Sequence, residues 1–162
     1  MYFGKDFKSF CGVPLFLNGK SLSFVSEWKY LGITLVTENG FYCSATGPRS
    51  SFYRSSNSIL RVLKKPSEQV LLYLLYSICV PNITYACEVV NYHYKEKNSL
   101  HVAVNDAIRR IFSYNRWESI KCLRNSFGYL SVTEIFTKRR MSFKQSLCKV
   151  GNGLLSKLSQ IN

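Results

Sequence analysis

The sequence predicts an α+β fold, in which a small N-terminal antiparallel β-hairpin or sheet is followed by an α-helical bundle. Hydrophobic residues make up 46% and aromatic residues 15% of the 162 residues, which is enough to bury a core. Hydrophobicity alternates along the N-terminal part and changes to a 3.6-residue period after Gly47. We therefore expect two regions, residues 1–46 and residues 47–162.

Residues 15–36 are expected to form an antiparallel hairpin. Asn18-Gly19 lies between two apolar segments, and both residues tolerate the positive φ angles of a tight turn. The β-branched residues at 29–36 predict a third strand. Residues 41–43 predict a short fourth strand.

Caps and prolines mark the first two helices. Thr46 is predicted to cap a helix that has Pro48 in its first turn. The segment 66–68 opens a second helix, which Pro81 is expected to end or kink. A third helical piece is expected from residue 85 to about 92, following the same apolar pattern.

The apolar segment 70–90 has two interpretations. Its only charged residue is Glu88, and a membrane-spanning helix needs about 20 apolar residues. Pro81 interrupts the segment, however, and proline removes a helix hydrogen bond. We therefore expect a buried helix pair broken at Pro81, and no membrane partner.

Three further helices are predicted towards the C-terminus. Ser99 is expected to cap a fourth helix, and residues 117–125 a shorter one that ends at Gly128. Ser131 and Glu134 have the spacing of a capping box, in which each side chain accepts a free backbone N–H. The apolar stripe of the fourth helix consists of Leu100, Val104, Ala107, Ile108 and Ile111.

The chain is strongly basic. It has 22 Lys and Arg residues against 9 Asp and Glu residues, a net charge of +13 and a pI near 9.6. Such a surface attracts polyanions, of which nucleic acid is the commonest. The alternative is a basic but inert fragment of a larger protein.

Three groups of basic residues are candidate nucleic-acid contacts. Arg54, Arg61 and Lys65 share one face of the first predicted helix, away from its apolar stripe. A second group lies among aromatic residues that can stack on bases: Arg109, Arg110, Arg116, Lys121 and Arg124. The third group is Lys138, Arg139, Arg140 and Lys144. Solvated helix faces are the alternative interpretation of all three.

The residue types that catalysis or metal binding needs are scarce. Asp occurs only at Asp6 and Asp106, too far apart in sequence to predict a two-metal site. His93 and His101 lack metal-binding spacing, and no two cysteines have C-x-x-C spacing. We expect no catalytic residue, metal or cofactor. The N-terminus does not resemble a signal peptide, so an intracellular location, nucleus or cytoplasm, is expected.

Four segments, in this order, carry a resemblance to a known family. The first is WKYLGI at 28–33, after the predicted hairpin, and the second is RSSFYRSSNSIL at 49–60. The others are LYSICVPNITYACE at 75–88 and NDAIRRIF at 105–112, the last followed by FGY at 127–129. Together they resemble the C-terminal region of the reverse transcriptase of LINE-type, non-LTR retrotransposons, over roughly residues 11–143. Ala86 departs from the glycine that is usual in that family, and we expect little consequence.

The resemblance implies that the hairpin is primer-grip-like and that the helical bundle is the thumb of an RNA-directed DNA polymerase. Trp28, Tyr30, Leu31 and Gly32 would then lie near the primer end. Arg54, Arg61 and Lys65 are the first candidates for backbone contacts with an RNA–DNA or DNA duplex. The fingers, most of the palm and the catalytic carboxylates of such an enzyme are missing, so the chain is not expected to be an enzyme. It is expected to start inside a domain, as a decayed element or a partial gene prediction.

Two other functions fit the same residues. The chain can be a repurposed basic helical module that binds nucleic acid independently. It can also be a structural or interaction protein that uses the apolar segment 70–90 as a partner interface. A large exposed apolar patch would favour the interaction protein.

Overall fold

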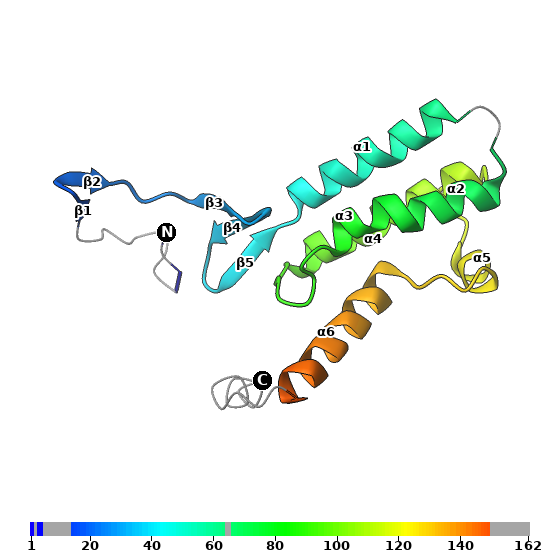
Figure 1. The fold of residues 1–162 in the computed structure, drawn as a ribbon. Helices are drawn as coiled ribbons and strands as arrows, with labels where there is room; N and C mark the ends of the chain where they lie inside the picture. Colours follow the sequence, from blue (N-terminus) through cyan, green and yellow to red (C-terminus); the bar gives the residue numbers. More distant parts are fainter. Residues whose placement is uncertain (2, 5–13, 64–65, 150–162) are drawn as a thin grey trace.

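The computed structural model describes residues 1, 3–4, 14–63 and 66–149, and it has the α+β fold (Figure 1). Two small antiparallel sheets come first and the helices follow. The strands are β1 (Leu15–Leu17), β2 (Lys20–Leu22), β3 (Glu27–Tyr30), β4 (Ile33–Thr37) and β5 (Phe41–Ser44). The helical elements are α1 (Thr46–Val62), α2 (Glu68–Leu74), the π-helical η1 (Leu75–Cys79), α3 (Val80–Thr84), α4 (Tyr94–Ile111), α5 (Lys121–Ser126) and α6 (Val132–Lys149).

Strands β1 and β2 form the hairpin expected at Asn18-Gly19. The turn residues have φ angles of 49° and 75°, and Leu15 pairs with Leu22. The hairpin projects away from the helices (Figure 1). Leu15 and Leu17 are 55% and 62% exposed, although both are apolar. This hairpin therefore contributes no residue to the hydrophobic core that the structure describes.

The prediction of a single strand over residues 29–36 is wrong. Leu31 and Gly32 have φ angles of 47° and 81°, and they make a two-residue turn between β3 and β4. Trp28 consequently pairs with Leu35 in an antiparallel ladder. Glycine accepts the left-handed conformation readily, which explains the turn inside an otherwise β-branched segment. The N-terminal region thus contains two hairpins and an additional strand, β5, which pairs with β4.

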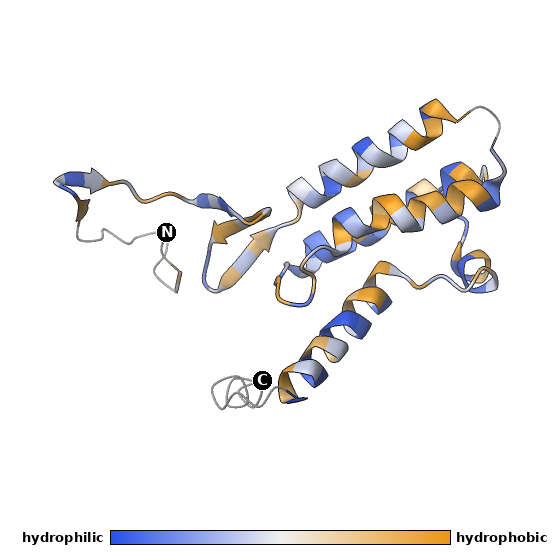
Figure 2. Cartoon of the chain, in the orientation of Figure 1, coloured by the Kyte–Doolittle hydropathy of each residue, from blue (hydrophilic) through white to orange (hydrophobic). Residues whose placement is uncertain are grey.

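The helices pack around one core. Helix α1 packs against η1 and α3, and α4 packs against α1, α2 and α6. Figure 2 shows that apolar residues concentrate along the continuous α2–η1–α3 segment. The apolar stripe predicted for α4 is confirmed, because four of its members are buried and Ile111 is half-buried. The largest fully buried hydrophobic side chains are Phe52, Leu72, Ile83, Leu100 and Ile108.

Two predicted helix starts are confirmed by their capping hydrogen bonds. The Ser67 hydroxyl accepts the Val70 N–H at the start of α2, at 3.4 Å. At α6 the Ser131 N–H donates to the Glu134 carboxylate at 2.6 Å, and the Glu134 N–H donates to the Ser131 hydroxyl at 3.2 Å. This reciprocal pair is the predicted capping box.

Two predicted caps are wrong. Thr46 lies inside α1, and the hydroxyl of Ser44 accepts its N–H at 3.3 Å. Glu96, from α4, accepts the preceding N–H of Ala45 at 2.9 Å. Ser99 lies inside α4, where its hydroxyl donates to the Glu96 carbonyl. Glu96, remote in sequence, thus binds the N–H of the N-cap residue Ala45, but α1 has no side-chain cap hydrogen bond of the kind predicted for Thr46.

Pro81 does not end the helical segment. It lies in the first turn of α3, directly after the π-helical turn η1. The wider i to i+5 hydrogen-bonding pattern of a π-helix changes which carbonyls need an N–H partner. The segment therefore continues to Thr84 before it leaves the helix.

The helix expected over residues 85–92 is absent from the structure. The chain instead turns there, and Ala86 has a φ of 53°. The helix expected over 117–125 is shorter than predicted, because α5 begins only at Lys121. Trp117 lies outside it and is strongly exposed. Gly128, with a φ of 71°, follows α5 as expected.

The β3–β5 sheet is joined to the helices through the segment that follows α3. The Cys43 N–H donates to the Asn91 carbonyl at 2.9 Å. The rings of Tyr42 and His93 stack with centroids 3.9 Å apart, and the His93 imidazole contacts the Glu38 carboxylate. Residue 46 thus separates strands from helices, but the core continues across it.

Candidate nucleic-acid interface

The outer face of α1 carries exposed arginines. Arg54 and Arg61 are exposed, whereas Phe52 and Ser56 are buried against the core on the opposite side. Helix α1 contains no acidic residue, and neither arginine forms an ion pair with another described residue. Lys65, predicted for the same face, lies outside the described residues. The positive charge of this face is consequently uncompensated locally.

Helix α4 adds a third arginine to this face. The Arg110 guanidinium donates to the side-chain oxygen of Asn57 at 3.0 Å, and Asn57 lies between Arg54 and Arg61 along α1. We call the set Arg54, Asn57, Arg61 and Arg110 the α1 basic face. The sequence places Arg110 in the second basic group. The packing of α4 on α1 puts it beside the arginines of α1.

Arg109 points elsewhere. Its guanidinium donates to the Asp106 carboxylate at 2.8 Å and to the Glu118 carbonyl at 3.1 Å. These bonds tie the end of α4 to the segment before α5. Its charge is thus already paired, so Arg109 is a weaker candidate for a phosphate contact than Arg110.

Arg124 is not available on the surface. Its side chain is only 8% exposed, and its Nε has no hydrogen-bond partner among the described residues. Burial lowers the pKa of His101, and the charge of Arg124 lowers it further. Arg116 and Lys121 are exposed, as a phosphate contact requires. The second group predicted from the sequence therefore does not form one surface patch.

Two residues of the third basic group hold the segment after α3. Arg139 donates to the Thr84 carbonyl at 2.9 Å and lies 3.6 Å from the Glu88 carboxylate. Arg140 donates to the carbonyls of Cys87 and Val90. These carbonyls belong to the end of α3 and the irregular segment after it, and the Thr84 carbonyl also accepts the Cys87 N–H at 3.3 Å. The role of both arginines is structural, and sequence alone predicted only a basic cluster.

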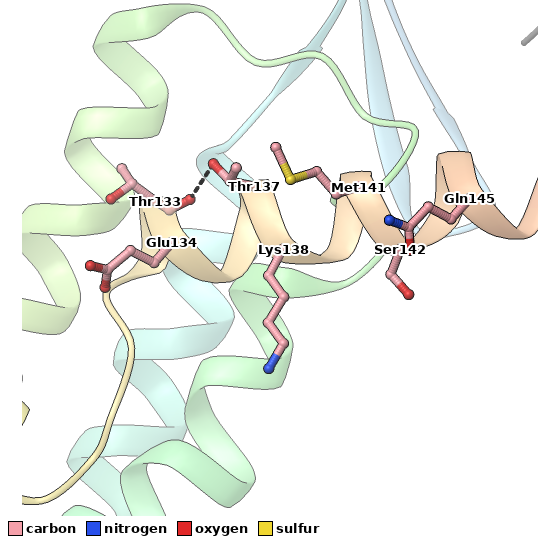
Figure 3. A pocket seen from close by; sticks show the side chains of 7 residues that line it. All are labelled: Thr133, Glu134, Thr137, Lys138, Met141, Ser142 and Gln145. Carbon is pink, nitrogen blue, oxygen red and sulfur yellow. Dashed lines mark hydrogen bonds between the residues drawn. The ribbon is translucent and has the colours of Figure 1, made fainter.

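The remaining members of the third group, Lys138 and Lys144, are exposed on α6. Lys138 borders an open hollow of about 650 Å³ that runs along this one helix. Figure 3 shows Lys138 and Met141 projecting from the helix beside this hollow. The described lining is supplied by α6 alone, so the hollow is a shallow open surface and not an enclosed pocket.

The residues that the resemblance predicts to be primer-grip-like lie in the β3–β4 hairpin, at or near its turn. Trp28 and Tyr30 are 58% and 61% exposed, and Leu31 and Gly32 form the turn itself. The Tyr85 hydroxyl donates to the Leu31 carbonyl at 3.2 Å. Two of the segments that carry the family resemblance are therefore in contact, through residues that are 54 positions apart in the sequence.

Sequence reasoning missed Tyr85 and Asn57 as members of these sites. Tyr85 follows Thr84 at the end of an apolar segment, and its aromatic type resembles that of many core residues. Asn57 is an ordinary polar residue of an exposed helix face. Tyr85 lies within the resembling segment 75–88, but the resemblance does not indicate its partner, and no sequence signal distinguishes Asn57. Both contacts depend on the packing of remote elements.

The part of the chain that the structure describes contains no group of three His, Cys, Asp or Glu residues able to hold a metal ion. Cys43, Cys79 and Cys87 are buried and unpaired, and Cys122 and Cys148 are exposed. Burial raises the pKa of the Cys79 thiol to about 11. Of the described helices, none combines the length and the apolar character that a bilayer crossing requires.

One side of the apolar segment 70–90 is internal, whereas the other side has exposed apolar residues: Val70, Tyr73, Ile78, Tyr85 and Val89. Its core side includes Leu72, Leu75, Cys79 and Ile83, which are buried against the other helices. No protein-family model, curated protein or solved structure matches the chain.

Proposed function

We propose that the chain is the primer-grip hairpin and thumb of a LINE-type reverse transcriptase, and that it holds a template–primer duplex by its backbone. The α1 basic face is the observation that carries the proposal. Its three arginines are exposed, come from two helices and have no acidic neighbour on α1. Arginine binds phosphate oxygens without reading base sequence, as a positioning element should.

The contact between Tyr85 and the Leu31 carbonyl supports the same proposal. It links the primer-grip-like turn to the segment that resembles the thumb signature. Gly32 permits a close approach of backbone to a ligand, and a β-carbon added at this position would lie 3.5 Å from the Tyr85 ring. A duplex end placed at this turn would meet backbone and aromatic side chains, whereas the duplex body would meet α1.

The exposed β1–β2 hairpin also fits a piece of a larger polymerase. Leu15, Phe16, Leu17 and Leu22 are all exposed in the chain alone. Apolar residues on a projecting hairpin are typical of an interface. In the proposed enzyme, the palm upstream of this chain would cover them, and the palm would supply the catalytic carboxylates.

Binding of an RNA–DNA duplex at several salt concentrations tests the proposal. Each arginine that neutralises a phosphate adds about 0.9 to the slope of log affinity against log salt for B-DNA. The variant R54A/R61A/R110A should flatten that slope by up to about 3 units and weaken binding at low salt. Duplexes of different sequence should bind equally well.

A matched variant separates this face from charge in general. K138A/K144A/K149A removes the same number of positive charges from the exposed surface of α6. It should leave the slope nearly unchanged. Circular dichroism checks that both variants are folded, which we expect because alanine favours helix. Equal effects of the two variants would reduce the α1 basic face to ordinary solvated surface.

The independent-module alternative makes a different prediction about solubility. A self-sufficient module should not associate through the β1–β2 hairpin, whereas an exposed palm edge at this hairpin should promote association. The exposed hairpin favours the polymerase fragment over the module.

A further inference from the structure

Strand β3 forms an open edge of its sheet. The strand order is β3–β4–β5, and no described strand pairs with the other side of β3. The Thr37 N–H donates to the Ser26 carbonyl at 2.8 Å, which fixes the alternation of hydrogen bonds along the ladder. Ser26, Trp28 and Tyr30 therefore direct their backbone groups towards β4. Glu27 and Lys29 direct theirs towards the open edge.

The side chains at this edge separate into two kinds. Glu27 and Lys29 lie on one face of the sheet and are both exposed. Trp28 and Tyr30 lie on the other face and are exposed as well. An edge strand with a free ladder of N–H and C=O groups and exposed aromatic side chains is a template for pairing with another strand.

We propose that β3 pairs antiparallel with β3 of a second copy of this chain, with Trp28 opposite Trp28 of the second copy. This register makes the strand complementary to itself. Glu27 then lies opposite Lys29 of the second copy, and Lys29 lies opposite Glu27 of the second copy. Opposite charges in directly opposed positions stabilise an antiparallel pair.

The backbone supports the same register. The groups that Glu27 and Lys29 direct outwards become the hydrogen-bonded pairs of the new ladder. The two Trp28 side chains occupy the non-hydrogen-bonded position, where opposed side chains approach most closely. The two three-stranded sheets would join into one six-stranded sheet related by a two-fold axis.

Charge makes a second copy a suitable occupant at this place. The chain as a whole carries +13, so most of its surfaces repel another copy. Glu27 and Lys29 cancel each other, and β3 contains no other charged residue. The edge is thus locally neutral and self-complementary. The pairing uses Trp28, which the proposed function places near the primer end, so it is tested on the chain without nucleic acid.

Sedimentation equilibrium of the full chain at physiological salt, without nucleic acid, tests this pairing. The single variants E27K and K29E place like charges opposite each other at both positions and should weaken dimerisation about tenfold. The double variant E27K/K29E exchanges the two residues and should restore the wild-type dissociation constant. K29E also lowers the net charge by two, so that general repulsion predicts the opposite result for this variant.

The outcomes are decisive in either direction. A wild-type monomer–dimer equilibrium, weakened by both single variants and restored by the exchange, supports the proposal. A chain that stays monomeric at all concentrations overturns it. Dimers that ignore the charge variants but disappear in L15K/L17K would also overturn it, because the β1–β2 hairpin would then be the interface. Circular dichroism establishes that each variant is folded.

Discussion

Replacing Ala86 with glycine should stabilise the protein. Ala86 has a φ of 53°, and its carbonyl accepts the N–H groups of Val89 and Val90 at 3.1 and 2.9 Å. A left-handed conformation costs about 1–2 kcal/mol for a residue with a β-carbon. Glycine avoids that cost but loses about 0.5–1 kcal/mol through the entropy of the unfolded chain. Ala86→Gly should therefore raise the free energy of unfolding by about 0.5–1 kcal/mol.

Urea denaturation followed by circular dichroism measures this change. For a chain of this size, 1 kcal/mol corresponds to about 2–4 °C in Tm, so thermal unfolding gives a second measurement. Ala107→Gly is the matched control, since Ala107 is buried inside α4, more than one turn from its end. It should destabilise by about 1–2 kcal/mol through lost helix propensity and lost packing. A loss of stability in Ala86→Gly comparable with that control would refute the reasoning.

Three other changes test features of the helical region. Arg140→Ala leaves two backbone carbonyls without their charged donor and should lower the free energy of unfolding by about 2 kcal/mol, whereas the exposed Lys138→Ala should change it by less than about 0.5 kcal/mol. Both values come from urea denaturation. Ser131→Ala removes the cap of α6 and should cost about 1 kcal/mol, visible as a lower urea midpoint at an unchanged m-value. Burial and the nearby Arg124 lower the pKa of His101, so the unfolded chain binds this proton first as pH falls. Stability should accordingly drop below about pH 6.5, and His101→Gln should reduce that drop in a series of unfolding curves. An unchanged pH profile would contradict the assignment.

The elements that the sequence predicts well depend on local patterns. The stripe of α4 and the capping box at Ser131 and Glu134 involve residues within a few turns of one another. Hydrophobic period and cap chemistry report such arrangements directly. The hairpin at Asn18-Gly19 is of the same kind.

Elements that depend on remote partners are predicted poorly. The segment 29–36, predicted as one strand, contains a turn at Leu31 and Gly32. Strand propensity misses it because most residues of the segment favour a strand and only one is glycine. The residue type of Thr46 and the nearby Pro48 predict a cap at Thr46, but α1 begins one residue earlier, and Glu96, which binds the N–H of Ala45, lies 51 residues away.

The basic residues show the same limit. Their positions in the sequence predict groups of charge. They do not predict which arginine side chains are buried or hydrogen-bonded within the fold. Arg139 and Arg140 bind backbone carbonyls, Arg124 is buried, and Arg110 joins α1. Only the predicted basic residues that are exposed and form no ion pair within the fold are candidates for a binding face.

The segment that follows α3 has a consequence for synthesis on the ribosome. Its carbonyls are held by Arg139 and Arg140, which lie 50 to 55 residues further along the chain. At about 5–20 residues per second, these arginines are made roughly 3–10 s after the carbonyls that they bind. During that interval the strained residue Ala86 and the tyrosine beside it lack the support of α6. The turn at Leu31, which Tyr85 contacts, therefore gains this support only after residues 139 and 140 have been made.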